Sequence, residues 1–250
     1  MQRKFTILLS ASVPSAERSA EFRKIPNAQI QIEQAVVGLA RNVFEKEGRL
    51  IFGGHPSISP LVALIAVEYE IDREAESFNK KDRPDKPIHI YQSRAYEKVM
   101  PDETSALFNL GYAQIIWTPA IDDERCAPEI KNAPQCEKSL EVMRKQMLDE
   151  NIDAMVCMGG MEGVIKEFEL FRKKHPDKPV YLFESTGGAT QNLAQAHRNS
   201  DIVKVIDTKR NDLLNIETDK NDDREKIELV PYTFFTALIV AQVLNEARGQ

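Results

Sequence analysis

Cysteine, long apolar runs and positive charge are all scarce in this sequence, and each scarcity excludes a class of protein. The 250 residues contain three cysteines and four histidines, scattered without the spacing of a metal site, so neither a metal nor a cofactor is expected. An odd count of only three cysteines favours a reducing, cytoplasmic compartment. No apolar run approaches the roughly 20 residues of a transmembrane helix, which argues against a membrane partner. The N-terminal run at 5–9 is too short for a signal peptide and predicts a first strand.

Positive charge is outnumbered, with 33 lysines and arginines against 39 acidic residues and a net charge of −6. Without a compensating basic stripe, this balance argues against nucleic acid as a partner. A hydrophobic content of 42% is ordinary for a globular protein. The even spread of strand signals predicts a single domain over 1–250, with surface excursions at 119–138 and 207–228.

Seven short apolar runs have the length of buried strands, and apolar patterns at helical spacing lie between them. This alternation predicts an α/β fold: a Rossmann-like three-layer sandwich, whose mostly parallel sheet of about seven strands has helices on both faces. In such folds ligands bind beyond the carboxyl ends of the strands. Strands are expected at 5–9, 50–52, 87–91, 115–117, 154–158, 179–183 and 202–206, and helices at 28–47, 61–67, 139–151, 164–171 and 232–247.

Three of these strands end at a glycine pair: Gly53-Gly54 and Gly159-Gly160 follow their strands directly, and Gly187-Gly188 follows its strand after three residues. Glycine permits positive φ and close approach, and a strand, glycine turn and helix in that order aim backbone N–H groups at a phosphate. Three such turns at one sheet edge predict a site for a phosphorylated or densely polar ligand. Besides the glycine pairs, the residues expected to contact this ligand are Ser10, Ser12, His55, Ser57, Arg94, Met161, Glu162, Gly163 and Thr190.

On these motifs the sequence resembles the SLOG superfamily of LOG-like and DprA-like Rossmann-type proteins. Its best-known enzymes are the LOG-type nucleoside 5′-monophosphate phosphoribohydrolases. The stretch Phe-Gly-Gly-His-Pro-Ser from residue 52 stands for the family's glycine loop, and Arg144-Lys145 for its Arg-Lys pair. Laid down without a gap from Arg144, the family pattern places Glu167 on its terminal glutamate. The resemblance therefore implies that Arg144 and Glu167 are the pair linked to cleavage of the N-glycosidic bond.

The chain departs from the family motif at Gly159, Met161 and Val164, where the family has proline, glycine and threonine. Since these positions form the loop that grips a 5′-phosphate, the resemblance favours binding over hydrolysis. The chain is similar to SLOG groups of bacterial conflict systems. That similarity implies a nucleotide-derived ligand, of the NAD, ADP-ribose or cyclic ADP-ribose type, in signalling or anti-phage defence, with a TIR-type NAD-processing partner.

Two alternative functions stay open. The chain can be an enzyme, an N-glycosidic hydrolase of nucleoside 5′-monophosphates or NAD-like substrates. It can also be an oligomeric scaffold whose ligand site is degenerate. Single residues have structural alternatives too: Glu167 can be an exposed first-turn residue that the helix dipole favours. Arg144 can be a solvated helix residue paired with Glu141 or Glu150, and His55 can stack under the next helix.

The cysteines and the C-terminal helix carry further expectations. Cys126 and Cys136 lie in the first excursion and could form a bridge, although thiols are the expected state in a reducing compartment. Cys157 falls within an apolar strand and is expected in the core. The helix at 232–247 is apolar nearly all round, which predicts burial together with a contact in a homodimer or higher homo-oligomer.

Overall fold

All seven strands form one parallel sheet in the order β4-β3-β2-β1-β5-β6-β7. The computed structural model describes residues 5–14, 28–74, 86–100, 102, 105, 113–126, 136–206 and 230–249. The strands are β1 (Thr6–Ser12), β2 (Arg49–Gly53), β3 (Ile88–Ser93), β4 (Ala113–Thr118), β5 (Ala154–Gly159), β6 (Val180–Phe183) and β7 (Val203–Ile206).

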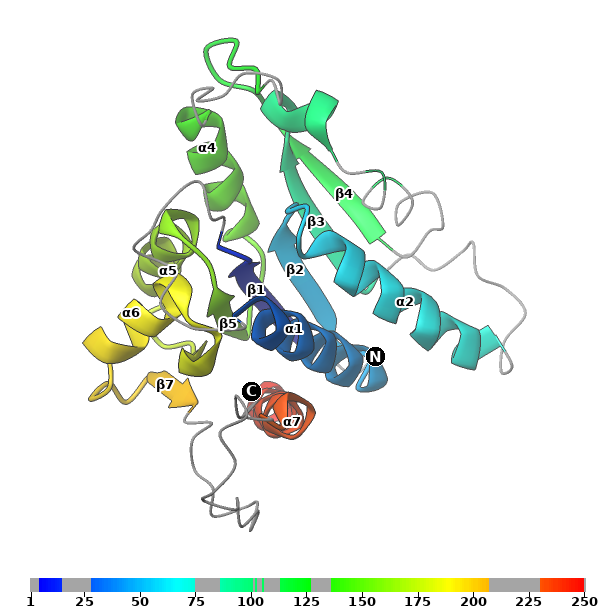
Figure 1. Ribbon diagram of the computed structural model, residues 1–250, viewed down its shortest axis with the longest axis vertical. Helices are drawn as coiled ribbons and strands as arrows, with labels where there is room; N and C mark the ends of the chain where they lie inside the picture. The colour runs from blue at the N-terminus through cyan, green and yellow to red at the C-terminus, as the bar shows by residue number, and fades with distance from the viewer. Residues whose placement is uncertain are drawn as a thin grey trace, which may run out of the picture.

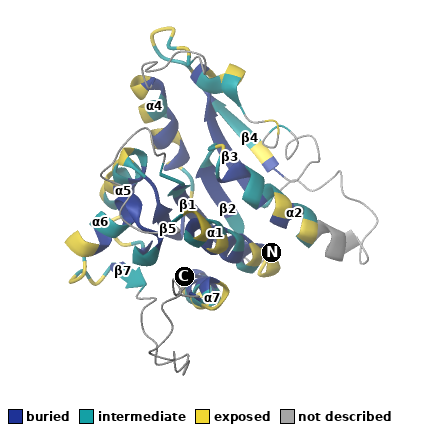
Figure 2. Cartoon of the chain, viewed as in Figure 1, coloured by how far each residue is buried: buried dark blue, intermediate teal, exposed yellow. Residues whose placement is uncertain are grey.

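Helices cover both faces of this sheet, which confirms the predicted three-layer α/β architecture (Figure 1). Because alternate side chains of each strand point to opposite faces, the buried residues divide into two cores. One core holds α1 (Ala28–Glu45), α2 (Ser59–Glu74) and α7 (Tyr232–Arg248). The other holds α4 (Glu137–Met147), α5 (Glu162–Lys174) and α6 (Gly188–Ala196). In Figure 2 the strands are mostly buried, and most exposed residues lie on the outer sides of the helices and in the connecting segments.

The chain order reverses between β1 and β5. From β1 the chain builds outward through β2, β3 and β4, and it then returns to place β5 against the other edge of β1. Such a switch point is where parallel α/β sheets open a crevice for ligands. The register pairs Ser10 with Cys157 and Ser12 with Gly159. The end of β1 and the second glycine turn therefore meet at this point.

The sequence located each strand and most helices, with small errors at the ends. β1 continues to Ser12 rather than ending at residue 9, because its last residues still pair with β5. α4 begins at Glu137, two residues earlier than expected, and α2 begins at Ser59. The helix α6 was missed, as were the short 3-10 helices η2 (Arg94–Val99) and η3 (Glu184–Thr186). Of the two expected excursions, residues 127–135 and 207–229 lie outside the described residues, and the single-domain division stays a prediction.

The C-terminal helix α7 packs along α1 (Figure 1). Its inward side is buried, including Tyr232, Ile239 and Val243, which agrees with the predicted burial of this helix. Phe234 and Leu238, one turn apart, are 45% and 53% exposed. A subunit contact on that side stays a prediction. Within the described residues, no helix is long and apolar enough to cross a membrane.

Candidate functional site

A buried carboxyl, a buried guanidinium and a serine hydroxyl meet beside the β1–β5 switch point. The Ser10 hydroxyl, on β1, donates a hydrogen bond of 2.5 Å to Glu167 Oε2, on α5. Arg144 Nε, on α4, lies 3.7 Å from Glu167 Oε1. The two side chains form an ion pair, but this distance is too long for a hydrogen bond. The Arg144 and Glu167 side chains are only 8% and 13% exposed. Three elements that are distant in the sequence thus bring together three residues that the sequence proposed for one site.

The Glu167 carboxyl is an unusual acid for a helix residue. Burial raises its pKa above the ordinary value, while the charge of Arg144 and the hydrogen bond from Ser10 pull that pKa partly back. Burial raises the pKa of Cys157, on β5, and the negative charge of the Glu167 carboxylate raises it further. The alternative reading of Glu167 as an exposed first-turn residue is therefore wrong.

Arg144 lies between two acidic residues and is largely buried, so the alternative that it is a solvated helix residue is wrong. Its guanidinium reaches Glu137 one way, at 3.8 Å, and Glu167 the other way. Lys166 also binds Glu137, at 2.6 Å, at the outer edge of the cluster. The proposed pairing with Glu141 or Glu150 is wrong because these carboxylates have other partners: Glu141 pairs with Lys145, and Glu150 with Tyr91 and His89.

One Arg144 nitrogen has no hydrogen-bond partner although it is buried. Within the described residues, its Nε neither donates to a carbonyl nor reaches a carboxylate within hydrogen-bond distance. A Cβ added at Gly163 would lie 3.5 Å from its Nη2, so the guanidinium passes close to the first turn of α5. Buried donors are almost always satisfied, so the Nε of Arg144 is an exception, and it faces the Glu167 carboxyl at 3.7 Å.

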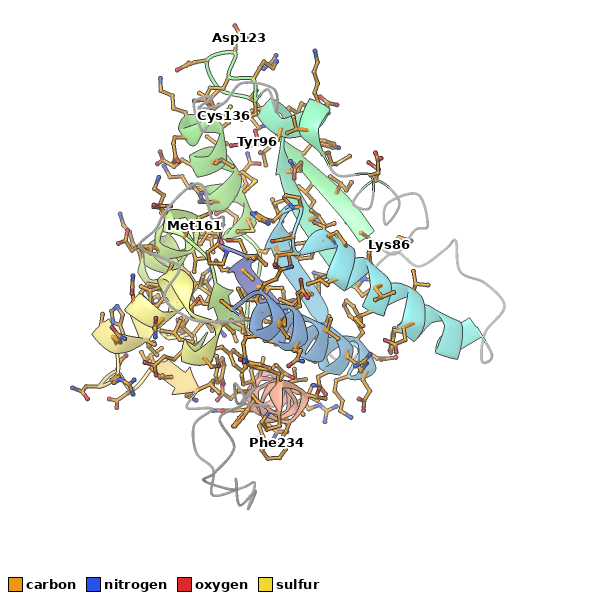
Figure 3. All side chains as sticks on the ribbon, in the orientation of Figure 1. Lys86, Tyr96, Asp123, Cys136, Met161 and Phe234 are labelled. Carbon is orange, nitrogen blue, oxygen red and sulfur yellow. The ribbon has the colours of Figure 1, made fainter. Side chains whose placement is uncertain are left out.

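The first turn of α5 carries backbone donors that the fold does not use. Met161, labelled in Figure 3, is the N-cap residue of this helix, and its side chain makes no capping hydrogen bond. In the described part of the chain, the N–H groups of Glu162 and Gly163 have no acceptor, whereas Val164 N donates to Met161 O at 3.0 Å. Orphan donors at a helix N-terminus, added to the helix dipole, attract anions.

The N–H groups of the second glycine pair are already engaged inside the fold. Gly159 N donates to Thr186 Oγ1 at 2.8 Å, and Gly160 N donates to the carbonyl of Ser12 at 2.8 Å. These two N–H groups are therefore not available to bind a phosphate, whereas those of Glu162 and Gly163 have no acceptor among the described residues. Both glycines have positive φ, 60° and 82°, which explains why glycine stands at each position.

The third glycine turn is joined to the second by a dense set of hydrogen bonds. Thr190 Oγ1 donates to the Gly159 carbonyl at 2.8 Å, and Ala189 N donates to the Gly160 carbonyl at 2.9 Å. Gly188, at φ 61°, lies so close that an added Cβ would stand 2.5 Å from the Gly160 oxygen. Gly187, Gly188 and Thr190 thus hold the second turn in place, and a ligand contact by these residues stays a prediction.

The first glycine loop, after β2, is also tied to the end of β1. Ser57 Oγ accepts from Val13 N at 3.2 Å and lies 2.8 Å from His55 Nδ1. An added Cβ at Gly54 would meet the Gln92 side chain at 2.0 Å, so close packing requires that glycine. Gly53 is less constrained, since its added Cβ would lie 3.2 Å from Met143 Cε. The loop adjoins the switch point, and its ligand contacts also stay predictions.

Arg94 lies apart from the cluster. It follows β3, two strands away from β1, and its guanidinium pairs with Glu97 at 3.1 Å. The same group lies over the Trp117 ring, 5.2 Å from the centroid. This residue is exposed, and its contacts place it on the β3–β4 side of the sheet.

Sequence reasoning missed several polar residues that organise the site: Glu137, Lys166, Thr186 and Gln92. Glu137 could have been found, because it precedes Arg144 by seven residues and so lies on the same helix face. Nothing local distinguishes Thr186 and Gln92, whose contacts are with glycines of separate turns, Gly159 and Gly54. Among the described residues, no group of three His, Cys, Asp or Glu could hold a metal ion.

Comparisons with known proteins bear on this arrangement. A model of the SLOG cluster3 family matches residues 22–215, which is most of the chain and includes Arg144 and Glu167. No curated protein matches. Among solved structures, the X-ray structure of TM1055, a Northeast Structural Genomics Consortium target, aligns with a TM-score of 0.45 and 16% identity, covering 80% of this chain and 90% of that chain. On the family match, this chain belongs to the SLOG cluster3 family.

Proposed function

We propose that this protein binds a nucleotide-derived ligand, of the NAD, ADP-ribose or cyclic ADP-ribose type, at the β1–β5 switch point. The observation that carries the proposal is the buried Arg144 guanidinium, whose Nε lacks a hydrogen-bond partner among the described residues. It lies beside the unused N–H groups of Glu162 and Gly163. A phosphate would supply the acceptor that the two N–H groups lack, next to the positive charge of the Arg144 guanidinium.

The remaining polar groups suit the sugar part of such a ligand. The Glu167 carboxyl, 3.7 Å from Arg144, can accept hydrogen bonds from ribose hydroxyls, and Ser10 fixes its orientation. Carboxylates and hydroxyls at a strand edge commonly bind ribose in parallel α/β folds. The departures from the family motif at Met161 and Val164 leave these groups in place. These groups are sufficient for binding a nucleotide, so we propose binding ahead of hydrolysis.

Ligand binding is tested by thermal shift and calorimetry with AMP, ADP-ribose, NAD and cyclic ADP-ribose. We expect at least one of them to raise the unfolding temperature. Arg144→Gln should weaken its binding by about 10- to 100-fold, the loss of one or two charge-assisted hydrogen bonds. Lys145→Gln is the matched control, since Lys145 is exposed on the same helix and pairs with Glu141. No shift with any of these nucleotides would contradict the proposal and favour the scaffold with a degenerate site.

A second candidate function is N-glycosidic hydrolysis of a nucleoside 5′-monophosphate or an NAD-like substrate. The observation that favours it is the Glu167 carboxyl, which lies next to Arg144 and is hydrogen bonded by Ser10. Cleavage passes through a cationic ribosyl centre, which a nearby carboxylate stabilises while water adds to the sugar and the base leaves. Hydrolysis is tested by incubating the protein with these substrates and measuring the released base by chromatography. Turnover lost in Glu167→Gln but kept in Glu169→Gln, an exposed residue of α5, would establish the enzyme.

We further propose that binding serves signalling or anti-phage defence, with a TIR-type NAD-processing protein supplying the ligand. Family membership supports this role, because the conflict-system SLOG groups that the sequence resembles are associated with nucleotide signals. The test is to treat NAD with such an enzyme and add the products to this protein. A shift in unfolding temperature with the products, but not with NAD alone, is the expected result. Equal shifts from both would contradict the supply relationship.

A further inference from the structure

Two cysteine thiols face each other at the far end of α4, outside the ligand site. Cys136 is the N-cap residue of α4, and its sulfur lies 2.8 Å from the sulfur of Cys126. Neither forms a disulfide in this structure. A disulfide requires a sulfur separation of about 2.05 Å, so a small approach of the two side chains would close it. Figure 3 shows Cys136 beside Tyr96, whose hydroxyl also hydrogen bonds Cys126.

We propose that Cys126 and Cys136 form a redox-active pair, which closes to an intramolecular disulfide by exchange with a low-molecular-weight disulfide such as oxidised glutathione. The pair is distinct from the Arg144–Glu167 cluster, and the proposal does not depend on which ligand that cluster binds. Cys157 takes no part, because it is fully buried in β5.

The two thiols have different surroundings, which sets the order of the reaction. Cys126 is partly exposed, whereas Cys136 is 2% exposed. Burial, and then the hydrogen bond with Cys126, raises the pKa of Cys136 to about 12. Since the thiolate is the nucleophile, the accessible Cys126 is the group that attacks the external disulfide. Cys136 then resolves the mixed disulfide.

The exchange balances without any further reactant. The Cys126 thiolate attacks one glutathione sulfur, forms the mixed disulfide and releases one glutathione thiolate. The Cys136 thiolate attacks the Cys126 sulfur, forms the protein disulfide and releases the second glutathione. The protein loses two protons and two electrons, and one oxidised glutathione becomes two reduced ones. A thiol reductant reverses both steps.

The surrounding chain already holds the two cysteines near each other. Ser139 N, in the first turn of α4, donates to Glu124 Oε2 at 2.8 Å, and Ile121 N donates to Ser139 Oγ at 2.9 Å. Cys126 N donates to the Ala95 carbonyl at 2.8 Å, which fixes the other cysteine against η2. The disulfide would therefore add a covalent link to a contact that exists without it. That link would secure the N-terminus of the helix that carries Arg144.

The test uses the full chain, equilibrated in glutathione buffers from fully reducing to strongly oxidising. After quenching with N-ethylmaleimide in denaturant, intact mass should show three labelled thiols in the reduced chain and one in the oxidised chain. Peptide mapping should show residues 126 and 136 linked. Cys136→Ser should accumulate glutathione on Cys126, and Cys157→Ser should close its disulfide as the wild type does.

Unfolding temperature gives a second, independent measurement. Closing a short loop in the unfolded chain should raise the unfolding temperature of the oxidised protein by roughly 5–10 °C, and dithiothreitol should reverse the rise. Three labelled thiols at every glutathione ratio would overturn the proposal. So would a bridge to Cys157, a bridge between two chains, or an oxidised protein that unfolds at a lower temperature than the reduced one.

Discussion

The hydroxyl of Ser10 donates to the carboxyl of Glu167 across 157 positions of sequence, at 2.5 Å. This contact joins the middle of the central strand to the helix that follows the second glycine turn. Among the residues that the structure describes, it is also the one short side-chain hydrogen bond to this carboxyl, since Arg144 Nε is 3.7 Å away. The stability of the site should therefore depend on a residue that carries no charge.

Ser10→Ala should destabilise the protein by about 1–3 kcal/mol, because it leaves a buried carboxyl without its hydrogen-bond donor. The measurement is the free energy of unfolding in urea at pH 7. Ser12→Ala is the control: Ser12 lies on the same strand, and within the described residues its hydroxyl makes no hydrogen bond. Equal losses in both variants would contradict the proposed role of the Ser10 contact.

Glu167 should also make stability depend on pH. Its folded-state pKa is raised, chiefly by burial, above the value near 4.5 of an ordinary glutamate. Such a group contributes stability that is fully present below its unfolded pKa and is lost as pH rises through the folded pKa. Relative to wild type, Glu167→Gln should therefore gain stability as pH rises above about 4.5, by up to about 1.4 kcal/mol per pH unit, until the folded pKa is passed.

The comparison requires urea unfolding of both proteins at several pH values across that range. Glu169→Gln, on the exposed side of the same helix, should follow the wild type at each pH. A difference between Glu167→Gln and wild type that is constant or shrinks as pH rises would show that Glu167 is not penalised by burial.

Gly188 allows the second and third glycine turns to touch. Gly188→Ala would place a Cβ 2.5 Å from the Gly160 oxygen, at φ 61°, where an L residue is strained. We expect a loss of about 2 kcal/mol or more in the free energy of unfolding. Gly249→Ala is the control, because its Cβ would come no closer than 3.7 Å and its φ is −85°. If both variants unfold alike, the two turns are not packed as described.

The sequence predicted the architecture well because the strands and helices have regular apolar periods. It also brought Ser10, Arg144 and Glu167 to one place, through strand order and a gapless motif. What it missed has a common cause: Thr186 and Gln92 contact glycine turns that are distant in the sequence, and such contacts leave no periodic signal. The glycine turns show the same limit. Their positions were correct, but the N–H groups of Gly159 and Gly160 serve the fold, which only the hydrogen-bond partners reveal.

Two tyrosines on the α1–α7 side of the sheet should respond differently to the same substitution. The Tyr232 hydroxyl donates to Gln31 Oε1 at 2.5 Å and lies 2.8 Å from Ser185 Oγ, which links α7 to α1 and η3. Tyr232→Phe leaves those two partners unsatisfied and should cost about 1–3 kcal/mol. The Tyr181 hydroxyl is buried without a hydrogen-bond partner in the described chain. Tyr181→Phe should therefore be neutral or stabilising. Urea unfolding of the two variants measures both effects, and a larger loss in Tyr181→Phe would contradict this assignment of the two hydroxyls.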